Sequence, residues 1–228
     1  MNIAIMQPYF FPYIGYYQLV NSADEFIFFD DVNFIKKGYI NRNKIANNGN
    51  SVDFSLPIRR ISQFKKINEH FYIDDFENFK KMLFFSYKKS PYFKEIFSII
   101  DNIISSKEMN VAILNSKTIT AVFDYLNIEK KFSFSSLIPT PTEKKGQERI
   151  VFICQKKTSN AYHNPIGGKE NNLYCPDFFK KNGIDLKFIK RIRGNHPISQ
   201  NNFSMIDALM NNSPEKIKEH LNDYELIE

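Results

Sequence analysis

A glutamine, two prolines and a cluster of phenols occur together in the segment MQPYFFPYIGYYQLV, residues 6–20. The prolines stiffen this segment, and phenol hydroxyls beside a rigid loop need polar partners, so the cluster as a whole favours a ligand site. Any single ring of the cluster fits core packing equally well. The candidate binding residues are Gln7, Tyr9, Gly15 and Tyr16, and Tyr13 is a candidate catalytic residue.

Two carboxylates, two lysines and an arginine follow in the segment DDVNFIKKGYINRN, residues 30–43. Gly38 permits a tight turn, and the planar guanidinium of Arg42 suits a phosphate or a carboxylate, which makes Arg42 the preferred anion-binding residue. The alternative is an ordinary solvated loop. Asp31 is a candidate proton acceptor, and the further candidate binding residues are Lys37, Asn41 and Asn43.

A histidine and two glycines form a third group in the segment AYHNPIGGK, residues 161–169. His163 is the best candidate for a general base, and its alternative is a structural histidine. Gly167 and Gly168 would let backbone N–H groups approach a phosphate, although a Gly-Gly pair also occurs in simple turns, and Asn164 is a candidate binding residue. The other histidines are His70 and His220, expected at the surface, and His196, expected in a loop.

The chain lacks the sequence motifs of several common enzyme classes. The chain has no GxGxxG, GxxxxGK[ST], GxSxG or HExxH pattern, and its histidines lack the spacing of metal ligands. Its two cysteines, Cys154 and Cys175, lie far apart and fit reduced thiols in the cytoplasm. No apolar run reaches the roughly 20 residues that cross a bilayer, so we expect a soluble chain without membrane contact. The net charge of +6 comes from scattered lysine and arginine groups and suits an anionic metabolite such as a nucleotide sugar.

The strands and helices expected to position these groups indicate an α/β fold. An apolar strand at 2–6, a helix at 13–21 and a strand at 25–29 make the start of a βαβ unit and hence of a parallel sheet. We expect one domain over residues 1–228, with a mostly parallel sheet and a helix-rich middle. Further strands are predicted at 51–57, 132–134, 161–162 and 184–189, and further helices at 74–88, 92–104, 110–126, 148–156, 175–182, 205–210 and 214–221.

Open parallel sheets bind their ligands at the carboxyl ends of the strands. We therefore expect one pocket at that edge, lined by Gln7, Tyr13, Asp31 and Arg42. The later half of the chain is expected to bring His163 and the two adjacent glycines to the same pocket.

The three segments, together with SMIDALMNN near the carboxyl end, resemble the WbqC-like family over nearly the whole chain. The resemblance implies a role in the biosynthesis of bacterial O-antigen and other surface glycans. It further implies acylation or aminoacylation, for instance with glycine, of the amine of a nucleotide-linked amino sugar. The donor would be acyl-CoA, aminoacyl-tRNA, or ATP with a free amino acid.

The opening strand, proline-rich loop and helical glycine are also similar to the HxGH nucleotidyltransferases, with Tyr13 and Tyr16 at the two histidine positions. Phenols do not replace imidazolium in stabilising a transferring phosphate, so this likeness supports the fold more than the reaction. Two alternatives remain open: an adenylyl- or nucleotidyl-transferring ligase, and a non-catalytic protein that binds nucleotide sugars within a glycan assembly complex.

Overall fold

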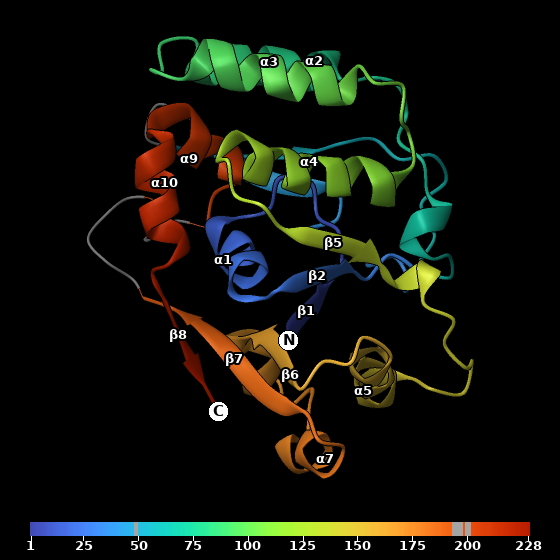
Figure 1. Cartoon of the computed structure of the whole chain (residues 1–228). Helices are drawn as coiled ribbons and strands as arrows, with labels where there is room; N and C mark the ends of the chain where they lie inside the picture. Colours follow the sequence, from blue (N-terminus) through green and yellow to red (C-terminus); the bar gives the residue numbers. More distant parts are fainter. Residues whose placement is uncertain (48–49, 193–197, 199–201) are drawn as a thin grey trace.

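The computed structural model describes residues 1–47, 50–192, 198 and 202–228, within which six strands form one sheet (Figure 1). The sheet has the order β5-β2-β1-β6-β7-β8, and its strands are β1 Asn2–Met6, β2 Glu25–Phe28, β5 Lys131–Phe134, β6 Ala161–Pro165, β7 Asp185–Arg191 and β8 Tyr224–Ile227. All of them run parallel except β8, which pairs antiparallel with β7. This confirms the predicted single-domain α/β fold with a mostly parallel sheet.

Side chains of the central strands alternate between two apolar cores, one on each face of the sheet. Ala4 and Phe26 point into the larger core, which includes α1 (Ile14–Ser22). Ile3, Ile5 and Ile27 point into the smaller core, which includes α5 and α7. Those two helices span Gly146–Lys156 and Pro176–Lys181. Because β1 is buried on both faces, its apolar run identifies it in the sequence.

The direction of strand addition reverses at β1. The chain passes from β1 through α1 to β2 on one side, and it later passes from β5 through α5 to β6 on the other side. Because α1 and α5 belong to opposite cores, the connections cover opposite faces of the sheet. Open α/β sheets bind ligands beside such a switch point, which here lies at the carboxyl ends of β1 and β6.

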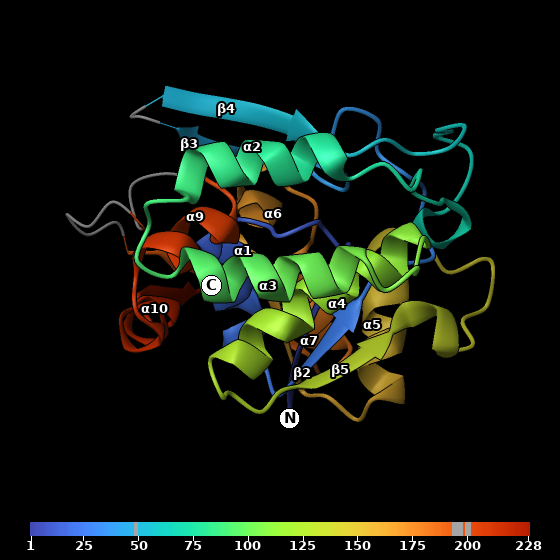
Figure 2. The ribbon, with the colours of Figure 1, turned by 90° about the horizontal axis from the view of Figure 1, so that it is seen from above.

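The helix-rich middle of the chain lies on the α1 side of the sheet (Figures 1 and 2). It consists of η1 Ile67–Glu69, α2 Glu77–Tyr87, α3 Phe93–Ile104 and α4 Val111–Tyr125, and the later helices α9 Met205–Asn211 and α10 Pro214–Leu221 join the same core. The hairpin of β3 (Arg42–Asn47) and β4 (Asn50–Ser55) lies beside α2 in Figure 2. Among the described helices, none has the length and apolar character needed to cross a bilayer.

Three elements differ from the sequence prediction. β3 begins at Arg42, where a polar loop was expected, and β8 was not predicted at all. The expected glycine loop after β6 is instead the short helix α6 (Ile166–Glu170). A short 3-10 helix, η2 (Ser135–Leu137), directly follows β5.

Candidate functional site

The loop after β1 gathers phenols around Gln7. The Tyr16 hydroxyl donates to the Gln7 backbone carbonyl over 2.8 Å, and the Tyr9 hydroxyl donates to the Gln7 side-chain oxygen over 3.2 Å. The two rings pack with their centroids 5.7 Å apart. Burial raises the pKa of Tyr9 to about 12 and raises the pKa of Tyr16 well above its ordinary value, so both phenols stay protonated donors at neutral pH. The structure thus brings Gln7, Tyr9 and Tyr16 together at the carboxyl end of β1.

Phe11, in the same loop, has a backbone conformation that residues other than glycine rarely adopt. Its φ is 39°, and side chains from three elements fix it there. Asn43 Nδ2 and Ser204 Oγ each donate to the Phe11 carbonyl over 2.7 Å, and Thr118 Oγ1 accepts from the Phe11 N–H over 3.2 Å. Asn43, predicted to bind a ligand, therefore holds this loop in place.

Tyr13 and Gly15 lie beside the carboxyl end of β7. The Arg191 guanidinium carbon is 5.6 Å from the centroid of the Tyr13 ring. A Cβ on Gly15 would lie 2.4 Å from the Tyr13 ring and 2.7 Å from the Arg191 side chain, so only glycine lets these two groups meet. Burial raises the pKa of Tyr13, although the Arg191 charge opposes that shift. The role of Gly15 is therefore to leave room for the contact between Tyr13 and Arg191.

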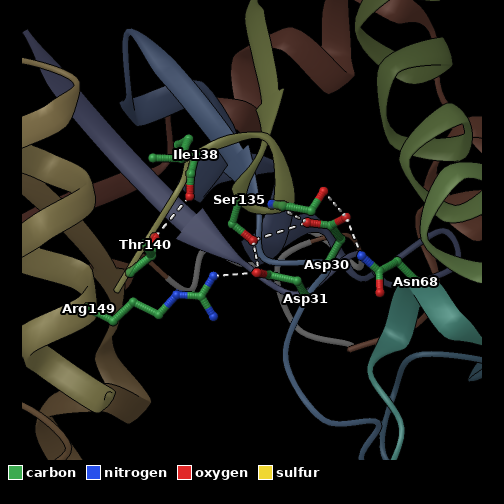
Figure 3. Close-up of polar contacts among 8 residues, drawn as sticks. Asp30, Asp31, Asn68, Ser135, Ile138, Thr140 and Arg149 are labelled. Carbon is green, nitrogen blue, oxygen red and sulfur yellow. Dashed lines mark hydrogen bonds and ion pairs between the residues drawn. The ribbon is translucent and has the colours of Figure 1, made fainter. Parts of the chain in front are cut away.

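Asp31 lies beyond the end of β2 and forms an ion pair that the sequence analysis missed (Figure 3). Arg149 Nη2 of α5 is 2.6 Å from one Asp31 oxygen, and Ser135 Oγ donates to the other over 2.5 Å. The Arg149 guanidinium also stacks 4.8 Å from the centroid of Phe29, and its buried Nε–H has no hydrogen-bond partner among the described residues. Asp31 and Arg149 are 118 residues apart, and only the sheet brings them together.

The neighbouring carboxylate, Asp30, is buried and saturated. It accepts from Asn68 Nδ2 over 3.1 Å, and Ser135 Oγ, whose single proton it shares with Asp31, lies 3.1 Å away. The backbone N–H and hydroxyl of Ser136 donate to it over 3.0 Å and 2.7 Å. Asp30 thus joins the ends of β2 and β5 to the η1 segment (Figure 3).

Two adjacent cavities share Arg42 and Lys37. One, of about 310 Å³, is lined by Lys37, Gly38, Tyr39, Arg42, Asn43, Lys44, Asp53 and Phe54. The other, of about 440 Å³, is lined by Phe34, Lys36, Lys37, Asn41, Arg42, Ser55 and Ile61. The Tyr39 ring, 6.3 Å from the Tyr9 ring, connects this region to the phenol cluster.

Two cations of these cavities, Lys37 and Arg42, are unpaired among the described residues. In the part of the chain that the structure describes, neither Lys37 nor Arg42 forms an ion pair or a side-chain hydrogen bond. Asn41, by contrast, donates to the Leu56 carbonyl over 2.7 Å and is buried. Of the predicted binding residues in this segment, Lys37 and Arg42 are therefore available to a ligand, and the asparagines hold the backbone.

His163 lies inside the sheet, away from its carboxyl edge. It pairs with Ala4 of β1, three residues before Gln7, which is roughly 10 Å at the usual rise along a strand. The ring is 3% exposed, and its Nδ1 lies 3.1 Å from the hydroxyl of Ser22 at the end of α1. Burial lowers the pKa of His163 and favours the neutral ring.

The residues after His163 point to the opposite face. Asn164 Nδ2 donates to the Tyr162 hydroxyl over 2.7 Å within the smaller core. A Cβ on Gly168 would lie 2.1 Å from the Asn164 side-chain oxygen, so this glycine permits close packing. Gly167 is in the first turn of α6, and its carbonyl accepts from Asn171 Nδ2 over 2.7 Å. Both glycines thus lie in the first turn of a helix, where the sequence predicted a loop.

The other three histidines were also considered as functional residues. His70, expected at the surface, is buried against the Phe34 ring, with its Nδ1 2.7 Å from the Lys66 carbonyl and its Nε2 accepting from the Ser62 N–H. His220 is partly buried and lies 2.6 Å from Asp223. His196 lies outside the described residues.

The chain is similar to a known protein family and to one curated relative. The sequence profile of the WbqC-like protein family matches residues 7–219, which include the phenol loop and both cavities. A relative in Mycobacterium tuberculosis, described as uncharacterized protein Rv1507c, is 27% identical over 165 residues, or 71% of either chain. No solved structure matches the chain significantly. The chain belongs to the WbqC-like protein family.

Proposed function

We propose that this protein is a cytoplasmic transferase that acylates or aminoacylates the amine of a nucleotide-linked amino sugar in bacterial surface-polysaccharide biosynthesis. The observation that carries the proposal is the position of Lys37 and Arg42. Both cations are without an ion pair among the described residues, and they stand between two cavities beside the phenol cluster. Two positive charges match the two negative charges of a sugar-linked diphosphate.

In this proposal each group of the site has a separate task. Arg42 and Lys37 hold the diphosphate, and the loop from Gln7 to Tyr16 packs against the sugar or the base. The sugar amine attacks the acyl carbonyl and a C–N bond forms. The bond between the acyl carbon and its carrier breaks, the carrier (CoA, tRNA or AMP) leaves with the electron pair, and the proton of the amine passes to a carboxylate. Asp31 is the favoured acceptor, because it lies at the carboxyl end of β2 whereas His163 is enclosed beneath α1.

A second candidate is an adenylyl- or nucleotidyl-transferring ligase. The reversal of strand order at β1 favours it, because nucleotides bind at such switch points in open α/β sheets. ATP-dependent release of AMP or pyrophosphate with a free amino acid would distinguish the ligase from a transferase that uses acyl-CoA or aminoacyl-tRNA.

The test combines binding with product analysis. The full chain is screened by thermal shift against nucleotide amino sugars, and each stabilising sugar is then incubated with acyl-CoA, aminoacyl-tRNA, or ATP with glycine. Mass spectrometry should show a nucleotide sugar heavier by one acyl group with one of these donors. An unchanged mass with every donor would assign a binding role instead, and the absence of any stabilising sugar would overturn the proposal.

A further inference from the structure

Tyr39 is an exposed aromatic ring in a cavity of charged residues. It exposes 64% of its surface, although it sits between the turn at Gly38 and the buried Ile40. Its ring packs against Tyr9, with 6.3 Å between centroids, which limits its orientation. A ring that is held in place and open to solvent beside cations can stack on a nucleobase, and that contact typically contributes about 1–3 kcal/mol per base.

The solvent face of the β3–β4 hairpin forms one wall of the same cavity. Arg42 and Lys44 alternate outward on β3, and in the strand register Lys44 lies opposite Asp53. Among the described residues Asp53 has no ion pair or side-chain hydrogen bond, and the Lys44 amine instead lies 5.6 Å from the Phe203 ring. The Asp53 carboxylate can therefore accept hydrogen bonds from the hydroxyls of a ribose.

The second cavity, on the other side of Arg42, has a different character. Its wall includes Phe34 and Ile61, and the cations Lys36, Lys37 and Arg42 stand at its boundary. An apolar wall suits a deoxygenated sugar or an acyl group better than a nucleoside with its many polar atoms.

We propose that the cavity at Tyr39 binds the nucleoside diphosphate part of the substrate, and that the cavity at Ile61 binds the group attached to its second phosphate. The base stacks on Tyr39, the ribose hydroxyls meet Asp53, and Arg42 and Lys37 contact the two phosphates where the cavities meet. The assignment rests on the proposed function for the identity of the attached sugar, and it adds the direction in which the nucleotide lies.

The direction can be tested by calorimetric titration of the full chain with three probes: inorganic pyrophosphate, UDP, and the corresponding nucleotide sugar. Tyr39→Leu should weaken both nucleotide probes by about tenfold or more and leave pyrophosphate unchanged. Tyr39→Phe should restore nucleotide binding, because the ring is kept. Ile61→Ser should weaken only the sugar-bearing probe, and Arg42→Ala should weaken all three.

Exposed Lys216 of α10 supplies the matched control, since Lys216→Ala removes a cation far along the chain and should leave all three affinities unchanged. Nucleotide affinity that is unaltered in Tyr39→Leu would overturn the assignment. So would binding of tRNA with no binding of mononucleotides. If acylated product forms although Tyr39→Leu is neutral, the assignment fails and the transferase proposal stands. If nucleotides bind through Tyr39 and no donor yields a product, the assignment stands and the transferase proposal fails.

Discussion

Arg42 and Lys37 are available to a ligand because the carboxylates of the same segment are used elsewhere. Asp31 is paired with Arg149, and Asp30 accepts hydrogen bonds from Asn68 and Ser136. Lys37 and Arg42 follow these carboxylates closely in sequence, but the carboxylates do not pair with them in the structure. At the scale of single residues, the site depends on this separation of charges.

Arg42→Ala should reduce affinity for a diphosphate ligand by on the order of 2 kcal/mol, because a charge-assisted hydrogen bond is lost. Arg42→Lys should recover only part of the loss, since an ammonium does not reproduce the planar fork. Titration calorimetry with pyrophosphate measures both effects. The melting temperature should stay unchanged, because the side chain has no partner among the described residues, and a sharp fall with unaltered affinity would show Arg42 to be a structural residue.

Lys37 occupies a left-handed conformation, with φ at 62°, that costs a residue with a Cβ about 1–2 kcal/mol. Lys37→Gly should therefore raise the free energy of unfolding, by up to about 1 kcal/mol once the entropy of glycine is subtracted, while it weakens pyrophosphate binding. Urea denaturation and calorimetry give the two quantities. Lys36→Gly is the matched control: Lys36 is not among the residues with positive φ, so this change should destabilise the fold. Equal stability changes in both variants would argue against strain at Lys37.

At the scale of elements, α4 connects the two loops of the site through one side chain. Asn115 is fully buried, and its Nδ2 donates to the Pro8 carbonyl over 2.9 Å and to the Ile40 carbonyl over 2.8 Å. Its Oδ1 accepts from the Tyr72 hydroxyl over 2.7 Å. The helix thus holds the loop that carries the phenols and the loop that carries Tyr39 at a fixed spacing.

Asn115→Leu should lower the free energy of unfolding by roughly 3 kcal/mol, because three buried polar groups lose their partner. The loops should also loosen locally. The Phe10 N–H, which donates to the Ile40 carbonyl over 3.2 Å, should exchange its hydrogen faster than amides of β1. Lys117→Leu, at an exposed position of the same helix, should change stability by less than about 0.5 kcal/mol. Unaltered Phe10 exchange in Asn115→Leu would rule out the proposed link.

The elements that the sequence predicts well are those with a clear apolar pattern. β1 and the helices α2, α3 and α4 bury regular apolar positions, and their predicted ranges overlap the observed ones closely. β3 was missed because its inward positions are Asn43 and Ile45, so a polar residue interrupts the alternation. The pair of Asp31 with Arg149 was missed for another reason: it joins distant segments, and periodicity carries no information on such contacts.

At the scale of the whole molecule, the two ends of the parallel sheet use charge differently. The segment that follows β2 beyond the carboxyl end exposes Lys36 and Lys37, whereas the amino end buries the Glu25 carboxylate at the start of β2. Lys157 Nζ lies 2.5 Å and Lys131 Nζ 2.9 Å from Glu25, and Ser133 Oγ donates to it over 2.6 Å. These contacts tie β2 to β5 and α5. This buried charge network therefore lies at the end of the sheet opposite the proposed ligand site.

His163 should make the fold sensitive to mild acid. Burial lowers its pKa below the ordinary 6.5, so as the pH falls below 6.5 the unfolded chain binds a proton first and the folded state loses stability. His163→Gln should remove this part of the pH dependence, which urea denaturation between pH 7 and pH 5 would measure. Turnover should survive the change if Asp31 is the proton acceptor. A large loss of turnover at unchanged substrate affinity would instead assign the imidazole a role in the reaction.

Glu25 should dominate the response to stronger acid. Burial alone raises the pKa of its carboxyl, but the contacts with Lys157, Ser133 and Lys131 outweigh burial, and the pKa lies below the ordinary 4.5. Its contribution to stability is therefore complete above pH 4.5 and is lost as the pH falls from 4.5 through the lowered value.

Glu25→Gln should lower the free energy of unfolding by roughly 3 kcal/mol at pH 7, because it leaves Lys157 without its counter-charge. The difference from the parent chain should shrink as the pH falls from 4.5 through the lowered pKa, below which the parent's own carboxyl is neutral. Glu77→Gln, which removes only an exposed pair with Lys80, should change stability by less than about 0.5 kcal/mol at every pH. A Glu25→Gln deficit that stays constant down to pH 3 would mean that packing, and not the carboxylate charge, holds the amino end of the sheet together.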